Sequence, residues 1–141
     1  MVETAKFYFF DVGVANQLHP DIRQVSEGSD VYGRAFEQLM INEVRACLSY
    51  RNDDRRLSYW RTSSGFEVDL VVGNMELALE LKSTSRLRNT DLRGLRALRD
   101  DHKVRRACLV SGLEHAERTN DGIDLLPWKD FVRQLWEGAL L

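Results

Sequence analysis

Two carboxylates and a lysine are spaced in this sequence in a way that suits metal-assisted hydrolysis. Asp69 lies within one strand-like run, 66–72, and Glu80 and Lys82 lie near the end of the next run, 76–82. Alternate residues of a strand share a face, so Glu80 and Lys82 are expected on the same face. A hairpin of the two runs would bring Asp69 to that face as well, directly opposite Glu80 or one diagonal step away.

The turn between the two runs leaves two registers open. A two-residue turn at Gly73-Asn74 pairs Val72 with Met75, whereas a four-residue loop pairs Val72 with Leu77. In either register Val68, Leu70 and Val72 are expected on one face and the carboxylates on the other. The hairpin therefore predicts a small area that holds carboxylates and one ammonium group.

Neighbouring carboxylates repel, and each raises the pKa of the other. A hard divalent cation with oxygen ligands relieves this repulsion and creates a site. Such a cation can polarise a phosphoryl oxygen and lower the pKa of a bound water, while a lysine orients or deprotonates that water. These residue types therefore point to phosphodiester hydrolysis. The alternative is an exposed hairpin face on which the charged groups are simply solvated.

The run 33–50 predicts a long amphipathic helix that could supply a third carboxylate. Its apolar residues recur at intervals of three and four, and Glu37 and Glu43 both fall within the apolar arc. A carboxylate on a core-facing side is costly unless it is paired or bound to a metal. Either glutamate could therefore reach Asp69 and Glu80, or could instead lie at the margin of the arc or pair with an arginine.

The remaining elements predict one α/β domain over 1–141, with a mixed sheet flanked by helices. The core over 33–110 has the order α-β-β-β-α-β. The expected elements around the candidate site are an N-terminal strand and short helix over 6–18, a loop over 20–32, a strand over 57–62, a helix over 90–101, a strand over 104–110, and a strand and helix over 123–138.

The charge is unevenly distributed along the 141 residues. Twenty basic and twenty-two acidic residues give a net charge of −2, yet the segment 86–106 holds eight basic and three acidic residues. Arginine suits forked contacts with phosphate, so Arg93 and Arg96 are candidate DNA contacts. The alternative is a solvated helix face with local ion pairs. No membrane span or basic leader is found, so a cytoplasmic protein is expected, with Cys47 and Cys108 as reduced core residues.

The order of these motifs resembles that of the PD-(D/E)xK nuclease superfamily. More closely, the chain resembles the nuclease-like C-terminal domain of unknown function of a family of prokaryotic AAA-type ATPases. The matching segments are 6–13, 33–37, 59–62, 66–69 and 79–82, and the resemblance spans about 6–136. Val68 stands where the superfamily name has proline.

The resemblance implies a restriction-endonuclease-like core, with Asp69, Glu80 and Glu37 as ligands of Mg²⁺ or Mn²⁺ and Lys82 as the catalytic lysine. It favours Glu37 over Glu43 because the family glutamate follows a glycine by four residues, here Gly33. The chain has no G-x-x-x-x-G-K-[ST] motif, so the ATPase itself is excluded. A fragment of such an ATPase, or a domain that partners it, is expected.

Two hypotheses follow from these residues. The first is a metal-dependent nuclease acting on DNA, and the second is a non-catalytic module that keeps the fold and binds nucleic acid or docks on its ATPase. A hairpin face that serves as an oligomer interface is a third possibility.

Overall fold

The computed structural model describes residues 8–9, 11–17 and 26–141. Its helices are α1 (Val12–Gln17), α2 (Asp30–Tyr50), the 3₁₀ turn η1 (Asn89–Leu92), α3 (Arg93–Asp101) and α4 (Trp128–Glu137). Its strands are β1 (Leu57–Arg61), β2 (Glu67–Val72), β3 (Leu77–Lys82), β4 (Ala107–Ser111), β5 (Glu117–Arg118) and β6 (Asp124–Pro127). Among the described residues, no helix is both long and apolar enough to cross a membrane.

The strands form one mixed sheet in the order β1-β2-β3-β4-β6-β5. The pairs β1–β2, β2–β3 and β5–β6 are antiparallel, whereas β3–β4 and β4–β6 are parallel. The parallel β3–β4 pair requires a crossover, and α3 supplies it. The order α2-β1-β2-β3-α3-β4 confirms the predicted α-β-β-β-α-β succession and the α/β class with a mixed sheet.

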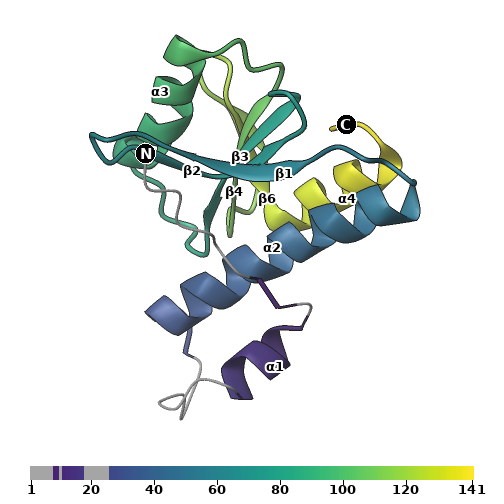
Figure 1. The fold of residues 1–141 in the computed structure, drawn as a ribbon. Coiled ribbons are helices and arrows are strands. Elements are labelled where there is room, and N and C mark those ends of the chain that lie inside the picture. The colour runs from purple at the N-terminus through teal and green to yellow at the C-terminus, as the bar shows by residue number, and fades with distance from the viewer. Residues whose placement is uncertain (1–7, 10, 18–25) are drawn as a thin grey trace.

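Helices cover both faces of this sheet (Figure 1). On one face α2 and α4 lie side by side, and their buried residues pack with Leu70, Leu79 and Leu81. On the other face α3 packs on Val71 and Ala78. Cys47 and Cys108 are both buried and unpaired, as the sequence predicts.

Helix α3 approaches the sheet closely at a glycine. A Cβ atom added to Gly94 would lie 1.9 Å from the carbonyl oxygen of Glu67, in β2. That separation is far below any van der Waals contact, so only glycine allows the helix to sit this near to the strand. Gly94 therefore sets the distance between α3 and the strand that carries Asp69.

Helix α2 begins three residues earlier than the sequence predicts, because Asp30–Tyr32 are helical rather than part of the loop. The side-chain oxygen of Ser29 accepts a hydrogen bond from the backbone N–H of Tyr32 at 3.2 Å and caps the helix. The periodicity of this run also places Leu39 within the apolar arc of the helix, but this residue is 43% exposed rather than core-facing.

Strand β2 contains one extra residue relative to β1. Ser58 pairs with Val71 and Trp60 with Val68, so two steps along β1 match three steps along β2. A bulge of this kind changes the face to which the following side chains point. Val68 consequently packs on the α3 face while Leu70 packs on the α2 face. The prediction that they share a face is therefore wrong.

The N-terminal strand is not observed in the part of the predicted run that the structure describes. Tyr8 and Phe9 lie outside any helix or strand. The side-chain amides of Gln38 and Asn42 instead both donate to the carbonyl oxygen of Phe9, each at 2.8 Å. Residues 6–7, 10 and 18–25 of the predicted strand, helix and loop lie outside the described residues. The short helix is confirmed as α1, with Asp11 accepting a hydrogen bond from the backbone N–H of Val14.

Candidate functional site

The β2–β3 hairpin adopts the longer-loop register. Val72 pairs with Leu77 and Leu70 with Leu79, and residues 73–76 form the turn. The backbone at Met75, with φ of 68°, lies in the left-handed region within this turn. Continued by one residue, this register sets Asp69 opposite Glu80.

Regular pairing nevertheless stops before Asp69. The last paired residues are Leu70 and Leu79, although both strands continue beyond them. The Asp69 carboxylate accepts a hydrogen bond from the backbone N–H of Leu81 at 2.8 Å. A side chain thus satisfies a backbone donor of β3 and ties Asp69 to the strand that carries Glu80 and Lys82.

Glu80 and Lys82 form an ion pair, with 2.6 Å between Lys82 Nζ and Glu80 Oε1. Glu80 is only 7% exposed. Its second oxygen, Oε2, is buried and has no hydrogen-bond partner among the described residues. An unpartnered buried carboxylate oxygen is costly, so Glu80 is an acid that its own protein satisfies only in part.

The electrostatics at this pair have identifiable causes. The pKa of Glu80 is raised to about 7, chiefly by burial and also by the charge of Asp69, against the opposing effect of Lys82. Burial alone would lower the pKa of Lys82, but its hydrogen bond to Glu80 and the charges of Glu80 and Asp69 raise it above its usual value. Lys82 is therefore protonated at neutral pH, whereas Glu80 titrates close to neutral pH.

The raised pKa of Glu80 predicts a loss of stability above acidic pH. In the unfolded chain Glu80 ionises near 4.5, while the folded chain holds this proton up to about 7. The free energy of unfolding should therefore fall as the pH rises through that window, by about 3 kcal/mol. Urea unfolding at about pH 5 and about pH 8 measures the fall, which Glu80→Gln should largely remove and Glu43→Gln should keep. An equal fall in wild type and Glu80→Gln would contradict the prediction.

Helix α2 contributes Glu37 to this area through a tyrosine. The hydroxyl of Tyr8 donates to Glu37 Oε1 at 2.7 Å. Burial, the Glu37 contact and the charges of Asp69 and Glu67 together hold the pKa of Tyr8 well above its usual value. Tyr8 therefore contacts Glu37 directly and lies within electrostatic range of Asp69.

The structure separates the two helix glutamates that the sequence left as candidates. Glu43 accepts a hydrogen bond from the indole N–H of Trp136 at 2.9 Å, on the side of α2 that faces α4. Glu37 instead lies with Tyr8. Tyr8 was missed as a site residue because its partner lies 29 positions away, and no local pattern links the two.

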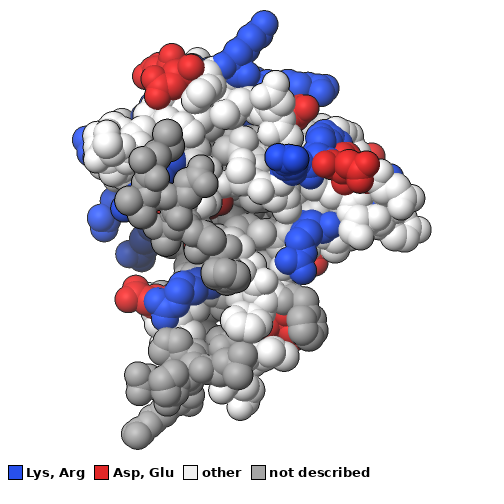
Figure 2. Space-filling model, viewed as in Figure 1, with Lys and Arg blue, Asp and Glu red and all other residues white. Residues whose placement is uncertain are grey.

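The two candidate phosphate contacts differ in their surroundings. Arg96 is bound to Asp121, with 2.8 Å between Nε and Oδ2, and also donates to the side-chain oxygen of Asn89. Arg96 is thus held in an ion pair, but its acid lies 25 residues further along the chain, outside the basic segment, so the pair is not the local one expected as the alternative. Arg93 is exposed at the first residue of α3. Figure 2 likewise shows acidic and basic side chains interspersed over one face of the molecule.

Within the described ranges, no three His, Cys, Asp or Glu side chains form a group that could hold a metal ion as they stand. The structure thus brings Asp69, Glu80 and Lys82 together on one hairpin and places Glu37 on α2, hydrogen-bonded to Tyr8. The arrangement places the partly satisfied carboxylate of Glu80 next to the ammonium group of Lys82, on the hairpin that also carries Asp69.

Comparison with known proteins identifies the family of the chain. No curated protein and no solved structure matches it. One family model, described as a domain of unknown function (DUF4143), matches residues 32–131. Because this match spans more than two thirds of the chain, the protein belongs to the DUF4143 family, which is known from proteins associated with AAA-type ATPases.

Proposed function

We propose that this protein is a metal-dependent nuclease-like domain that hydrolyses phosphodiester bonds of DNA. One observation carries the proposal, namely the state of Glu80. This carboxylate is buried beside Asp69 and Lys82, its pKa is raised by burial and by the Asp69 charge, and its Oε2 atom has no partner among the described residues. A purely structural ion pair would not need a second acid at this position.

The chemistry of the donor set suits a hard divalent cation, and Asp69, Glu80 and Glu37 would have to draw closer together than they stand in order to hold it. Carboxylate oxygens are the ligands that Mg²⁺ and Mn²⁺ prefer, and a cation would offset the repulsion between Asp69 and Glu80. Asp69, Glu80 and Glu37 would hold the ion, with Tyr8 orienting Glu37. When bound, the ion would polarise a phosphoryl oxygen and lower the pKa of a water molecule.

The role of Lys82 follows from its charge. Its pKa is raised by Glu80 and Asp69, so the side chain carries a proton at neutral pH. A protonated lysine donates hydrogen bonds and cannot accept a proton. Lys82 would therefore orient the attacking water, or a phosphate oxygen, rather than act as the base.

The order of elements supports the same proposal. The α-β-β-β-α-β succession from α2 through β4 agrees with the order that the resemblance implies for a restriction-endonuclease-like core, which we propose here. DNA as the substrate belongs to the proposal. An ATPase domain as the partner belongs to it as well, because the family is known from ATPase-associated proteins. Fold alone does not imply activity, so the weight rests on the site.

A non-catalytic module remains the second candidate, and a specific observation favours it. Glu80 is paired with Lys82, and Glu37 with Tyr8, so the protein's own groups partly occupy both carboxylates. A domain that has lost its metal could keep these contacts for stability alone while it binds nucleic acid or docks on an ATPase.

Calorimetric titration with Mn²⁺ separates the two candidates. Wild type should bind Mn²⁺, and Asp69→Asn should weaken binding by about 100-fold because it removes one charged ligand. The asparagine oxygen can still accept the Leu81 hydrogen bond, so the hairpin should be preserved. Glu43→Gln, on the same helix as Glu37 but bonded to Trp136, is the matched control and should bind as wild type does.

Either of two outcomes would favour the non-catalytic module. The first is an absence of Mn²⁺ binding by wild type, and the second is equal binding by wild type and Asp69→Asn. Weaker binding by Glu43→Gln than by Asp69→Asn would place the metal elsewhere on α2.

A further inference from the structure

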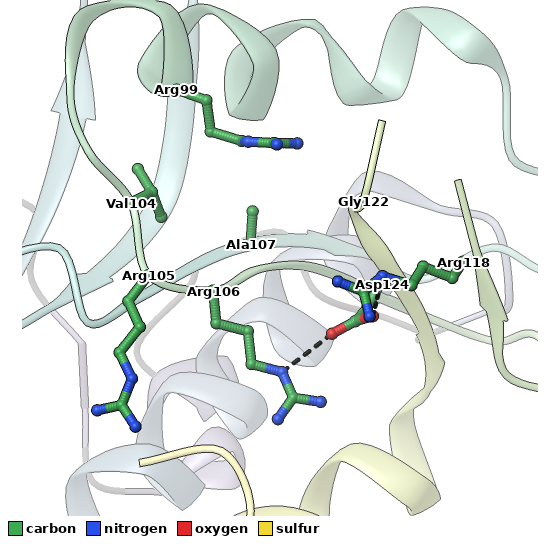
Figure 3. A pocket seen from close by; sticks show the side chains of 8 residues that line it. All are labelled: Arg99, Val104, Arg105, Arg106, Ala107, Arg118, Gly122 and Asp124. Carbon is green, nitrogen blue, oxygen red and sulfur yellow. Dashed lines mark hydrogen bonds and ion pairs between the residues drawn. The ribbon is translucent and has the colours of Figure 1, made fainter. Parts of the chain in front are cut away.

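A pocket of about 470 Å³ lies where β4 begins, away from the candidate site (Figure 3). Its lining comes from α3, β4, the β5–β6 hairpin and the segment before β4, and its charged members are Arg99, Arg105, Arg106, Arg118 and Asp124. In the parallel β3–β4 pair, Lys82 lies beside Ser111 and Ala78 beside Ala107. Four residues of strand, about 13 Å, therefore separate the pocket's end of the sheet from the end that carries Lys82.

The folded chain fixes two of the four arginines in this pocket. Arg106 pairs with Asp124, with 2.9 Å between Nε and Oδ2, and donates to the carbonyl oxygen of Ala139 at 2.7 Å. Arg99 donates to the carbonyl oxygen of Asp121 at 2.7 Å. These guanidinium groups are positioned before any ligand arrives, which lowers the entropic cost of binding.

The other two arginines retain most of their hydrogen-bonding capacity. The Arg105 side chain is exposed and makes no hydrogen bond or ion pair with the described residues; in Figure 3 no dashed line joins its guanidinium to the other residues drawn. The Arg118 side chain is 70% exposed, and its Nε lies 3.5 Å from Asp124. A guanidinium has five donors, so both groups can still bind a ligand.

The charge of the lining is unbalanced. The lining holds four guanidinium groups and one carboxylate, that of Asp124, which Arg106 and Arg118 share. Three positive charges are left without a counter-charge in the lining. This excess contrasts with the whole chain, whose net charge is −2.

We propose that this pocket binds a phosphate group, supplied by a free nucleotide or by a nucleic-acid backbone. Guanidinium forks match phosphate oxygens two at a time, and a multiply charged anion offsets more of the excess charge than one carboxylate would. The volume lies within the range of small-ligand sites. The site is independent of the proposed nuclease activity, because it shares no residue with Asp69, Glu80, Lys82 or Glu37.

The test uses the full chain and three probes, namely pyrophosphate, ADP and a single strand of about 12 nucleotides, titrated at about 50 mM salt. The double variant Arg105→Ala/Arg118→Ala should weaken binding by about tenfold or more, since each arginine supplies charge-assisted hydrogen bonds. The matched control, Arg45→Ala/Arg56→Ala, removes two exposed arginines outside the pocket and should bind as wild type does.

The arms of the experiment separate the sources of the phosphate. Binding of pyrophosphate and ADP with loss in the pocket variant identifies a free phosphorylated ligand. Binding of the oligonucleotide alone, with the same loss, identifies the nucleic-acid backbone. The proposal is overturned if no probe binds wild type, if both double variants bind equally, or if a polyglutamate peptide binds wild type as tightly as the best probe. The pocket variant Arg105→Ala/Arg118→Ala should bind Mn²⁺ as wild type does, because it leaves Asp69, Glu80 and Glu37 in place. Failure of the phosphate proposal and failure of the nuclease proposal are therefore distinguishable.

Discussion

Replacing Lys82 by alanine is expected to reduce Mg²⁺-dependent DNA cleavage by about 100-fold or more. The ammonium group of Lys82 lies 2.6 Å from Glu80 Oε1 and is the cation closest to the paired acids in the described hairpin. Under the proposed function, its loss would remove the donor that orients the attacking water or a phosphate oxygen, and it would leave Glu80 without its counter-charge. Cleavage of a labelled duplex, followed by gel electrophoresis, measures the rate.

The control for this variant is Lys129→Ala, which removes one exposed lysine from α4. The Lys129→Ala variant should cleave at the wild-type rate, because the Lys129 ammonium lies over the ring of Trp128 and is not part of the Glu80–Lys82 pair. A Lys82→Ala enzyme that retains full activity would remove Lys82 from the mechanism. Failure of wild type to cleave single-stranded, duplex and branched DNA at low salt would refute the nuclease proposal itself.

Substituting Gly94 by alanine is expected to lower the free energy of unfolding by about 3 kcal/mol. The new Cβ would lie 1.9 Å from the Glu67 carbonyl oxygen, and neither the helix backbone nor the strand can yield cheaply. The loss is expected although alanine favours helix over glycine by about 1 kcal/mol. Urea unfolding followed by circular dichroism measures the change.

Gly33→Ala provides the matched comparison, because Gly33 is also helical but has ordinary space around it. The nearest atom to a Cβ there is the Ser83 hydroxyl oxygen at 3.7 Å. This variant should be as stable as wild type or more stable by up to about 1 kcal/mol. Equal destabilisation by the two substitutions would show that the close contact at Gly94 is not the cause of the lower free energy of unfolding.

The parts of the fold and site that local patterns encode were predictable. Alternation along β3 places Glu80 and Lys82 together, and one of the two expected registers sets Asp69 opposite Glu80. The helical periodicity of α2 gives its core face, with Leu39 as the exception at its margin. These features depend on residues a few positions apart, for which the sequence pattern is sufficient.

The features that the sequence did not predict depend on distant residues or on small backbone irregularities. The bulge in β2 moves Val68 to the opposite face, and nothing in the alternation of that run reveals an added residue. The Tyr8–Glu37 hydrogen bond and the Arg96–Asp121 ion pair both form between segments that meet only in the folded chain. Local propensity carries no information about such contacts.

The contacts of the candidate site differ in the length of chain they close, and this difference has a consequence for folding. The Asp69–Leu81 hydrogen bond spans 12 residues, within one hairpin, whereas the Tyr8–Glu37 bond spans 29. Short loops close at lower entropic cost and faster than long ones. The two hairpin acids should therefore meet early in folding, and the helix acid should join them only when Tyr8 and α2 dock on the sheet. A partly folded chain would then hold the repelling acid pair before its third member arrives.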